Sequence, residues 1–124
     1  MTKLVLDVGN CSPDHTALAR LIEGAFDAKL YQSHGPRDTM AMLVAHRFSL
    51  VLVNRKLDQD YSDGLEIIKM IKAKPEYADL PIMLITNYPD HQQLAIDVGA
   101  TYGFGKLQLA APETRELLKA VLDA

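Results

Sequence analysis

The stretch that decides the fold is Phe48-Ser49-Leu50-Val51-Leu52-Val53-Asn54-Arg55. Four consecutive aliphatic residues end abruptly in an amide, and two cations, Arg55 and Lys56, follow it. A short run that is apolar on both faces predicts a parallel strand buried between two layers of helices. Ligands of such sheets bind just beyond the carboxyl ends of the strands. We therefore expect Asn54 at the functional edge, where an amide allows different chemistry from a carboxylate.

Length and composition predict an ordinary globular protein with one domain over residues 1–124. The net charge is −3 with both signs spread along the chain, which disfavours nucleic-acid or anionic-membrane partners. Cys11 is the only cysteine, which excludes an internal disulfide and a cysteine-based zinc site. No apolar run approaches the length of about 18 residues typical of a spanning helix, and we expect a cytoplasmic protein without a signal peptide.

Strand and helix patterns alternate five times along the chain. Further strands are expected at residues 3–7, 28–33, 82–85 and 102–104, and helices at about 12–26, 40–46, 63–71, 90–98 and 112–122. Ser12 has the chemistry of an N-cap, and Asp63 and Glu66 have the spacing of a capping box. Gly99 is expected to end the fourth helix.

This alternation favours right-handed crossovers and a three-layer α/β/α sandwich around a parallel sheet. The first, third and fourth strands are continuously apolar and belong in the middle of the sheet. The second alternates in polarity and the fifth is short, so both belong at edges. The predicted strand order is 2-1-3-4-5.

In that order four polar residues meet at the carboxyl edge of the sheet: Asp7, Asn54, Thr86 and Lys106. Each follows an apolar run, on the first, third, fourth and fifth strands respectively. Lys106 needs an anion, and Asp7 is the predicted partner in an ion pair. No metal or cofactor site is expected.

The layout resembles the receiver domain of bacterial response regulators, the flavodoxin-like (βα)5 fold of the chemotaxis regulators. The resemblance covers nearly all 124 residues. It rests on the acid after the first strand, Asp63-Gly64-Leu65-Glu66 opening the third helix, Thr86, Gly99-Ala100 and Lys106. It implies a non-enzymatic module of two-component phosphorelay signalling that acts on protein partners.

The chain departs from that family at the residues that carry its chemistry. Receivers are phosphorylated on an aspartate at the end of the third strand, and Asn54 stands there. A neutral amide is a far poorer nucleophile than a carboxylate. Receivers also hold Mg²⁺ with two adjacent acids, where this chain has Asp7-Val8. Gly103 stands where the switch aromatic is expected. We therefore predict a pseudo-receiver, a phosphorylation-independent protein-interaction module.

The opposing interpretation is a small-ligand-binding or enzymatic domain whose pocket is formed by Asp7, Cys11, Asn54 and Lys106. Cys11 precedes a helix N-terminus, where a thiolate is stabilised. A phosphatase loop would need an arginine six residues later, however, and Ala17 is there. The chain also lacks a Cys-x-x-Cys motif, so a thiol without a role is the favoured interpretation.

Receivers usually contact their partners through the fourth helix, fifth strand and fifth helix. The resemblance therefore implies a protein-binding or homodimer surface on these elements, constitutive because the phosphorylation input is missing. The residues expected to form it are His91, Gln92, Leu94, Ala95, Tyr102, Phe104, Glu113 and Glu116.

Overall fold

Five strands and five helices alternate in the computed structural model, which describes residues 2–123. The strands are β1 (Lys3–Val8), β2 (Ala28–Ser33), β3 (Leu50–Asn54), β4 (Ile82–Ile85) and β5 (Thr101–Phe104). The helices are α1 (Ser12–Ala25), α2 (Pro36–Ala45), α3 (Gly64–Lys72), α4 (Pro89–Asp97) and α5 (Pro112–Leu122). Two short 3-10 turns, η1 (Pro75–Tyr77) and η2 (Lys106–Gln108), complete the order.

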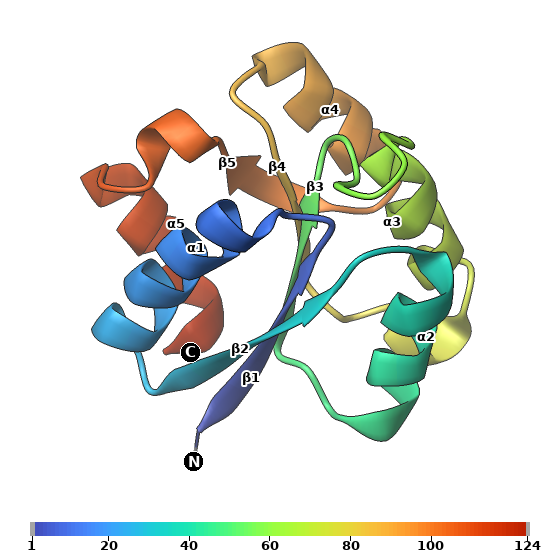
Figure 1. Ribbon diagram of the computed structural model, residues 1–124, viewed down its shortest axis with the longest axis horizontal. Coiled ribbons are helices and arrows are strands. Elements are labelled where there is room, and N and C mark those ends of the chain that lie inside the picture. Colours follow the sequence, from blue (N-terminus) through green and yellow to red (C-terminus); the bar gives the residue numbers. More distant parts are fainter. Residues whose placement is uncertain (1, 124) are drawn as a thin grey trace.

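All strand pairs are parallel, and the sheet order β2-β1-β3-β4-β5 confirms the predicted topology (Figure 1). The register of β4 and β5 shifts between Met83 and Ile85, so this edge of the ladder is irregular. Glycine in the middle of β5 is in keeping with such a bulge.

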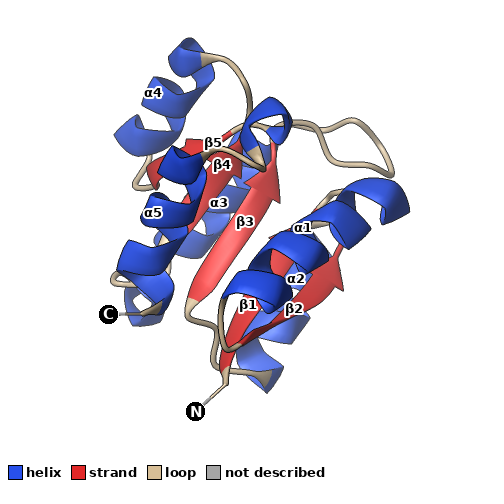
Figure 2. Ribbon diagram, turned by 90° about the vertical axis from the view of Figure 1, so that its left-hand side faces the viewer, coloured by secondary structure: helices blue, strands red, loops and turns tan. Residues whose placement is uncertain are grey.

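Helices cover both faces of the sheet and make three layers, as predicted (Figure 2). The core cluster on one face takes residues from α2, α3 and α4, and the cluster on the other face takes residues from α1 and α5. Within residues 2–123, no helix has the length and apolar character that crossing a bilayer requires.

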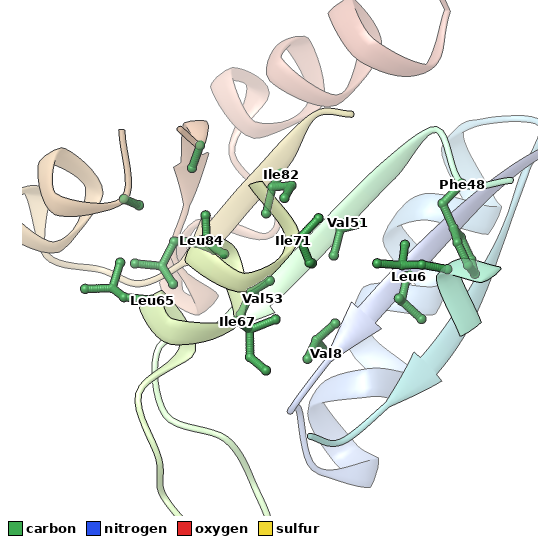
Figure 3. Packing of buried hydrophobic residues seen from close by; sticks show 14 of the residues in the cluster. Leu6, Val8, Phe48, Val51, Val53, Leu65, Ile67, Ile71, Ile82 and Leu84 are labelled. Carbon is green, nitrogen blue, oxygen red and sulfur yellow. The ribbon is translucent and has the colours of Figure 1, made fainter. Parts of the chain in front are cut away.

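The central strand supplies both clusters because its side chains alternate between the two faces. Val51 and Val53 pack with Leu6 and Val8 toward α2 and α3 (Figure 3). The intervening Leu50 and Leu52 enter the opposite cluster, and the four side chains of this run have no exposed surface. The strand is therefore buried on both sides, in agreement with its uniformly apolar sequence.

Two helix starts differ from the prediction. α1 is capped by Cys11 and not by Ser12, because the Cys11 carbonyl already accepts the His15 amide at 2.8 Å in the first helical bond. α2 begins at Pro36, four residues before the predicted start at 40, and the Asp38 carboxylate accepts the Gly35 amide at 2.8 Å. Proline at a first helical position loses no intrahelical bond.

The ends of two other helices follow their sequence signals. The Asp63 carboxylate accepts the Leu65 amide at 2.9 Å and caps α3 as expected. Glu66 does not complete the predicted capping box, because its carboxylate accepts from Lys69 Nζ at 3.3 Å. Gly99 follows α4 with φ +108°, a conformation that other residues rarely adopt.

Candidate functional site

The four predicted site residues lie where their strands end. Asp7 is the next-to-last residue of β1 and Asn54 is the last residue of β3. Thr86 follows β4 directly, and Lys106 follows β5 by two residues. Because all strands are parallel, these ends share one edge of the sheet, toward which the strand arrows point (Figure 2). The shared edge is as predicted, but the contacts among the four residues are not.

Asp7 is fully buried and is held by neighbours from its own loop and from α1. Its two carboxylate oxygens lie 2.5 Å from Asn10 Nδ2 and 2.8 Å from His15 Nδ1. Burial raises the pKa of Asp7, while the hydrogen bonds from Asn10 and His15 and the charges of His15 and Lys106 offset part of that rise. Asp7 is thus an enclosed carboxyl group whose hydrogen-bond partners come from its own loop and from α1.

The predicted ion pair between Asp7 and Lys106 is wrong. Lys106 Nζ lies 2.7 Å from Asp14 Oδ2, in the first turn of α1, and this hydrogen bond is the main reason that the pKa of Asp14 is lowered. Asp14 is about one-third exposed, and a long lysine side chain reaches it without desolvating its ammonium group. His15 takes the place beside Asp7 that was expected for the lysine.

Asn54 has a structural role that its amide performs and a carboxylate could not. Its Nδ2 donates to the Gly9 carbonyl at 3.2 Å and to the Lys56 carbonyl at 2.6 Å. Gly9 has φ +78° and lies directly against Leu57, so the loops after β1 and β3 are packed together. The Asn54 carbonyl lies so close to Gly64 that a Cβ at position 64 would clash with it. The start of α3 is therefore packed tightly against the end of β3.

Thr86 is buried and faces α4. Its hydroxyl accepts the Tyr88 amide at 3.3 Å and lies 3.2 Å from His91 Nδ1. A hydroxyl that accepts from the amide can donate its own proton to Nδ1, which places the imidazole proton on Nε2. The Tyr88 ring contacts the same imidazole edge-on at 5.3 Å. His91 therefore belongs to the strand-end site, which the sequence had not indicated.

Of the four residues predicted to form one pocket, Asn54 and Lys106 line the hollow at this edge of the described structure, and Asp7 and Cys11 do not. Cys11 is exposed and its thiol donates to Asp14 Oδ2 at 3.3 Å. Asp7 is enclosed by Asn10 and His15. The hollow at this edge, of about 330 Å³, lies on the α4 side and is lined by Asn54, Arg55, Lys56, Ile85, Thr86, Asn87, Tyr88, His91 and Lys106.

Three residues of the predicted partner surface are buried and cannot offer their side chains to a partner: Gln92, Ala95 and Phe104. Gln92 Nε2 donates to the Leu84 carbonyl and its Oε1 accepts the Gly103 amide, both at 2.9 Å. It thereby joins β4 to β5 where the ladder is irregular. Ala95 and Phe104 pack in the two core clusters.

The other members of that surface remain accessible. Leu94 is 47% and Tyr102 is 52% exposed, His91 is partly exposed, and Glu113 and Glu116 are exposed on α5. A shallow hollow of about 540 Å³ joins Tyr102 to Pro112, Glu113, Glu116, Leu117 and Ala120.

Metal-ligating side chains are sparse at the edge. In the described part of the chain, no three His, Cys, Asp or Glu side chains are grouped closely enough to hold a metal ion. Asp58, in the loop after β3, lies 3.0 Å from His34 Nδ1. Asp63 is engaged by Arg55 Nη1 at 3.0 Å.

Comparison with known proteins gives one curated relative. No family model matches the chain. The cyclic di-GMP phosphodiesterase response regulator RpfG of Xanthomonas campestris pv. campestris is 32% identical over 87 residues. The aligned segment is 68% of this chain and 22% of that protein, so the chain spans less than a quarter of the length of the curated relative it matches.

Solved structures match over the whole chain. A response regulator from Chloroflexus aurantiacus superposes with a TM-score of 0.85 at 15% identity, with complete coverage of both chains. The Vibrio cholerae chemotaxis protein CheY4 gives 0.81 at 22% identity, covering 98% of this chain and 100% of its own. The receiver domain of the Pseudomonas aeruginosa sensor histidine kinase PA1611, with magnesium in its active-site cleft, gives 0.80 at 14% identity and complete coverage of both chains.

The chain has the receiver-domain fold. The resemblance drawn from the sequence is confirmed at the level of fold, including the flavodoxin-like strand order. Within this receiver fold, Asn10, His15, His91 and Gln92 make the contacts that sequence reasoning missed or misplaced. Among these four residues, only His15 could have been inferred from the sequence to contact Asp7, because it lies in the first turn of α1, the helix that follows β1.

Proposed function

We propose that the chain is an atypical receiver domain of bacterial two-component signalling, which binds a protein partner without being phosphorylated on aspartate. The observation that carries the proposal is Asn54 at the end of β3, where the resemblance places the phosphoacceptor. Its amide nitrogen is committed to two backbone carbonyls, so it is a structural tie between loops and has no nucleophilic oxygen anion.

The surroundings of Asn54 support the same role. A Mg²⁺ site in this position needs several oxygen ligands, and carboxylates contribute most of the attraction. Asp7 is the remaining acid of the set, and both of its oxygens are engaged by Asn10 and His15. Lys106 is paired with Asp14 instead of lying free to meet a phosphoryl group.

We place the partner surface on α4, β5 and α5. Among the described residues, seven large hydrophobic side chains are exposed, and five of them fall between residues 88 and 107: Tyr88, Leu94, Ile96, Tyr102 and Leu107. Exposed apolar side chains are typical of protein-interaction surfaces, and three of these five, Leu94, Ile96 and Tyr102, lie on α4 and β5. Since Gln92, Ala95 and Phe104 are buried, Leu94 and Tyr102 with Glu113 and Glu116 are the side chains proposed to contact the partner.

The proposed role is not enzymatic. RpfG is named as a phosphodiesterase, but the aligned segment covers 22% of that protein, and its activity is not transferred to this chain. Bacterial signalling through protein contacts is the function that the receiver fold supports best here.

Binding to a captured partner tests the proposal. Affinity should be unchanged when acetyl phosphate and Mg²⁺ are added, and it should be lost in Leu94→Glu and Tyr102→Glu. Val44→Glu is a matched control, because Val44 is 81% exposed on α2, away from the proposed surface. Binding that requires the phosphodonor, or that survives both surface variants, contradicts the proposal. Sedimentation of the chain alone separates a homodimer from a different partner.

A further inference from the structure

Another hollow lies at the opposite edge of the sheet, where the strands begin. Lys3 opens β1, Ser49 precedes β3 and Pro81 precedes β4, and all three residues line it. Because the strands are parallel, their first residues share the edge opposite to Asp7 and Asn54. The volume of this amino-end hollow is about 630 Å³, within the range of small-molecule sites, roughly 300–1,000 Å³. It shares no lining residue with the hollow on the α4 side.

The walls of the amino-end hollow are held in place by contacts within the protein. One wall is the segment between α3 and β4, where Lys72 Nζ donates to three backbone carbonyls: those of Tyr77 at 3.2 Å, Ala78 at 3.0 Å and Leu80 at 2.7 Å. Phe48, in the loop between α2 and β3, is buried and packs edge-on against Tyr31 with the ring centroids 5.8 Å apart. The hollow is therefore preformed, as ligand sites usually are.

Two charged side chains of opposite sign line this hollow without pairing with each other. Arg47, in the loop between α2 and β3, is exposed and its side chain has no ion pair or hydrogen bond within residues 2–123. The same holds in that part of the chain for Glu76, which is exposed in η1. Asp79, a further acid of the lining, is directed to Lys72: burial lowers the pKa of that lysine, and the charge of Asp79 offsets part of the effect.

These unpaired groups define what a ligand needs. A free guanidinium group can bind a carboxylate through two parallel hydrogen bonds, and a free carboxylate can bind an ammonium group. Another part of the lining is apolar and consists of Leu43, Val44, Phe48, Leu80 and Val121. Val44 is aliphatic and yet 81% exposed, so an apolar part of a ligand can cover it. The hollow suits a molecule with two opposite charges and an apolar stretch.

We propose that the amino-end hollow binds an elongated zwitterion of the ω-amino carboxylate class, in which an apolar chain joins a carboxylate to an ammonium group. Arg47 binds the carboxylate, Glu76 binds the ammonium group, and the chain lies against Val44 and its apolar neighbours. A molecule with a charge of only one sign leaves one of the two protein side chains unpaired. Binding is reversible, involves no covalent step and takes place at the far end of the sheet from Asn54.

6-Aminohexanoate is the probe, titrated into the whole chain at constant ionic strength and followed by ¹H–¹⁵N chemical shifts. We expect saturable shifts centred on residues 43–49 and 76–81. Hexanoate and hexylamine each lack one of the two charges and should bind about threefold more weakly or less. An affinity for either of them equal to that for 6-aminohexanoate overturns the zwitterion assignment. The absence of saturable shifts in these two segments overturns the site.

Single variants assign each ligand charge to its partner. In Arg47→Gln, 6-aminohexanoate should bind no more tightly than hexylamine, and in Glu76→Gln no more tightly than hexanoate, because each variant removes the partner of one charge. Wild-type affinity in either variant contradicts the proposal.

Arg37→Gln is the matched control. It makes the same charge change as Arg47→Gln on the exposed surface of α2, outside the hollow, and should leave the affinity for 6-aminohexanoate unchanged. An equal loss in Arg37→Gln and Arg47→Gln means general charge attraction and contradicts the proposal. The side chains of Arg37, Arg47 and Glu76 are exposed, so all three variants should retain the fold.

Discussion

The interior of β3 and its carboxyl end are adjacent in sequence and follow different rules. Leu50 to Val53 are wholly buried and alternate between two core clusters, as any central strand of this fold requires. Asn54, the next residue, is half-buried and binds backbone carbonyls of two loops. The fold is thus specified by the shape and apolar character of the buried side chains. The chemistry at the edge of the sheet depends on single atoms of one residue. That chemistry can therefore change while the fold is kept.

The largest loss of stability is expected from a substitution in the buried part of β3. Leu52→Ala should lower the free energy of unfolding by roughly 2–5 kcal/mol, because it empties a site enclosed by the sheet and by helices on one face. Chemical denaturation measures it. Leu107→Ala is the control: Leu107 is 87% exposed, so its loss should change stability by less than about 0.5 kcal/mol. A cost for Leu52→Ala below about 1 kcal/mol would mean that β3 is not central.

A smaller loss of stability is expected when the amide at the end of β3 is replaced by a carboxylate. Asn54→Asp should destabilise by roughly 1–3 kcal/mol, because the Gly9 and Lys56 carbonyls lose their donor and face a negative charge. Asn54→Ala, which removes the donor without adding charge, should cost less. Denaturation of both variants checks the order, and an Asn54→Asp protein as stable as the wild type would show that these two hydrogen bonds contribute little.

The raised pKa of Asp7 predicts how the free energy of unfolding changes with pH. Burial raises its pKa, so the folded protein holds this proton more tightly than the unfolded chain does. Asp7 therefore contributes most to stability below its ordinary pKa of about 3.9, and that contribution falls as pH rises through the raised value, by at most about 1.4 kcal/mol per pH unit.

Asp7→Asn removes this titration. The stability of the wild type relative to Asp7→Asn should decline as pH rises from about 4 toward neutrality. Denaturation midpoints of both proteins across that range measure it. A relative stability of the wild type that increases with pH would mean that the contacts from Asn10 and His15 outweigh the effect of burial.

Most of the fold could be predicted from the sequence because burial on two faces leaves an unambiguous pattern. Val51, Leu84 and their neighbours form uninterrupted apolar runs, and two-sided burial identifies the inner strands. Helix starts were less certain, since several residues near 12 and 36 have capping chemistry. Which of them caps depends on where the first backbone bond forms.

The sequence predicted which residues lie at this edge of the sheet, but it did not predict which of them contact one another. Strand order placed Asp7 and Lys106 on one edge, yet the 2.7 Å contact of Lys106 is with Asp14, because side-chain reach and loop geometry are not encoded in strand periodicity. Gln92 was predicted to belong to the partner surface, but it is buried. The irregular ladder between β4 and β5 leaves backbone groups that its amide satisfies, and no local pattern reports such a need.

A very small effect is expected from Mg²⁺. A ligand at a hundred times its dissociation constant would add about 2.7 kcal/mol, which is several degrees for a domain of this size. With one carboxylate that is already engaged, about 10 mM Mg²⁺ should shift the melting temperature by no more than roughly 1 °C. A shift of several degrees that disappears in Asp7→Ala would mean that a cation site survives beside β1.

The most direct test is intact mass after incubation with acetyl phosphate and Mg²⁺. The wild type should show no added phosphoryl group, because Asn54 offers no carboxylate to attack phosphorus. Tryptic mapping would locate any addition, with Asp58 and Asp60 in the following loop as the acids to inspect first. An unmodified mass under conditions that fully phosphorylate an ordinary receiver is the predicted result; an acid-labile phosphoryl group on the wild type would contradict phosphorylation-independent function.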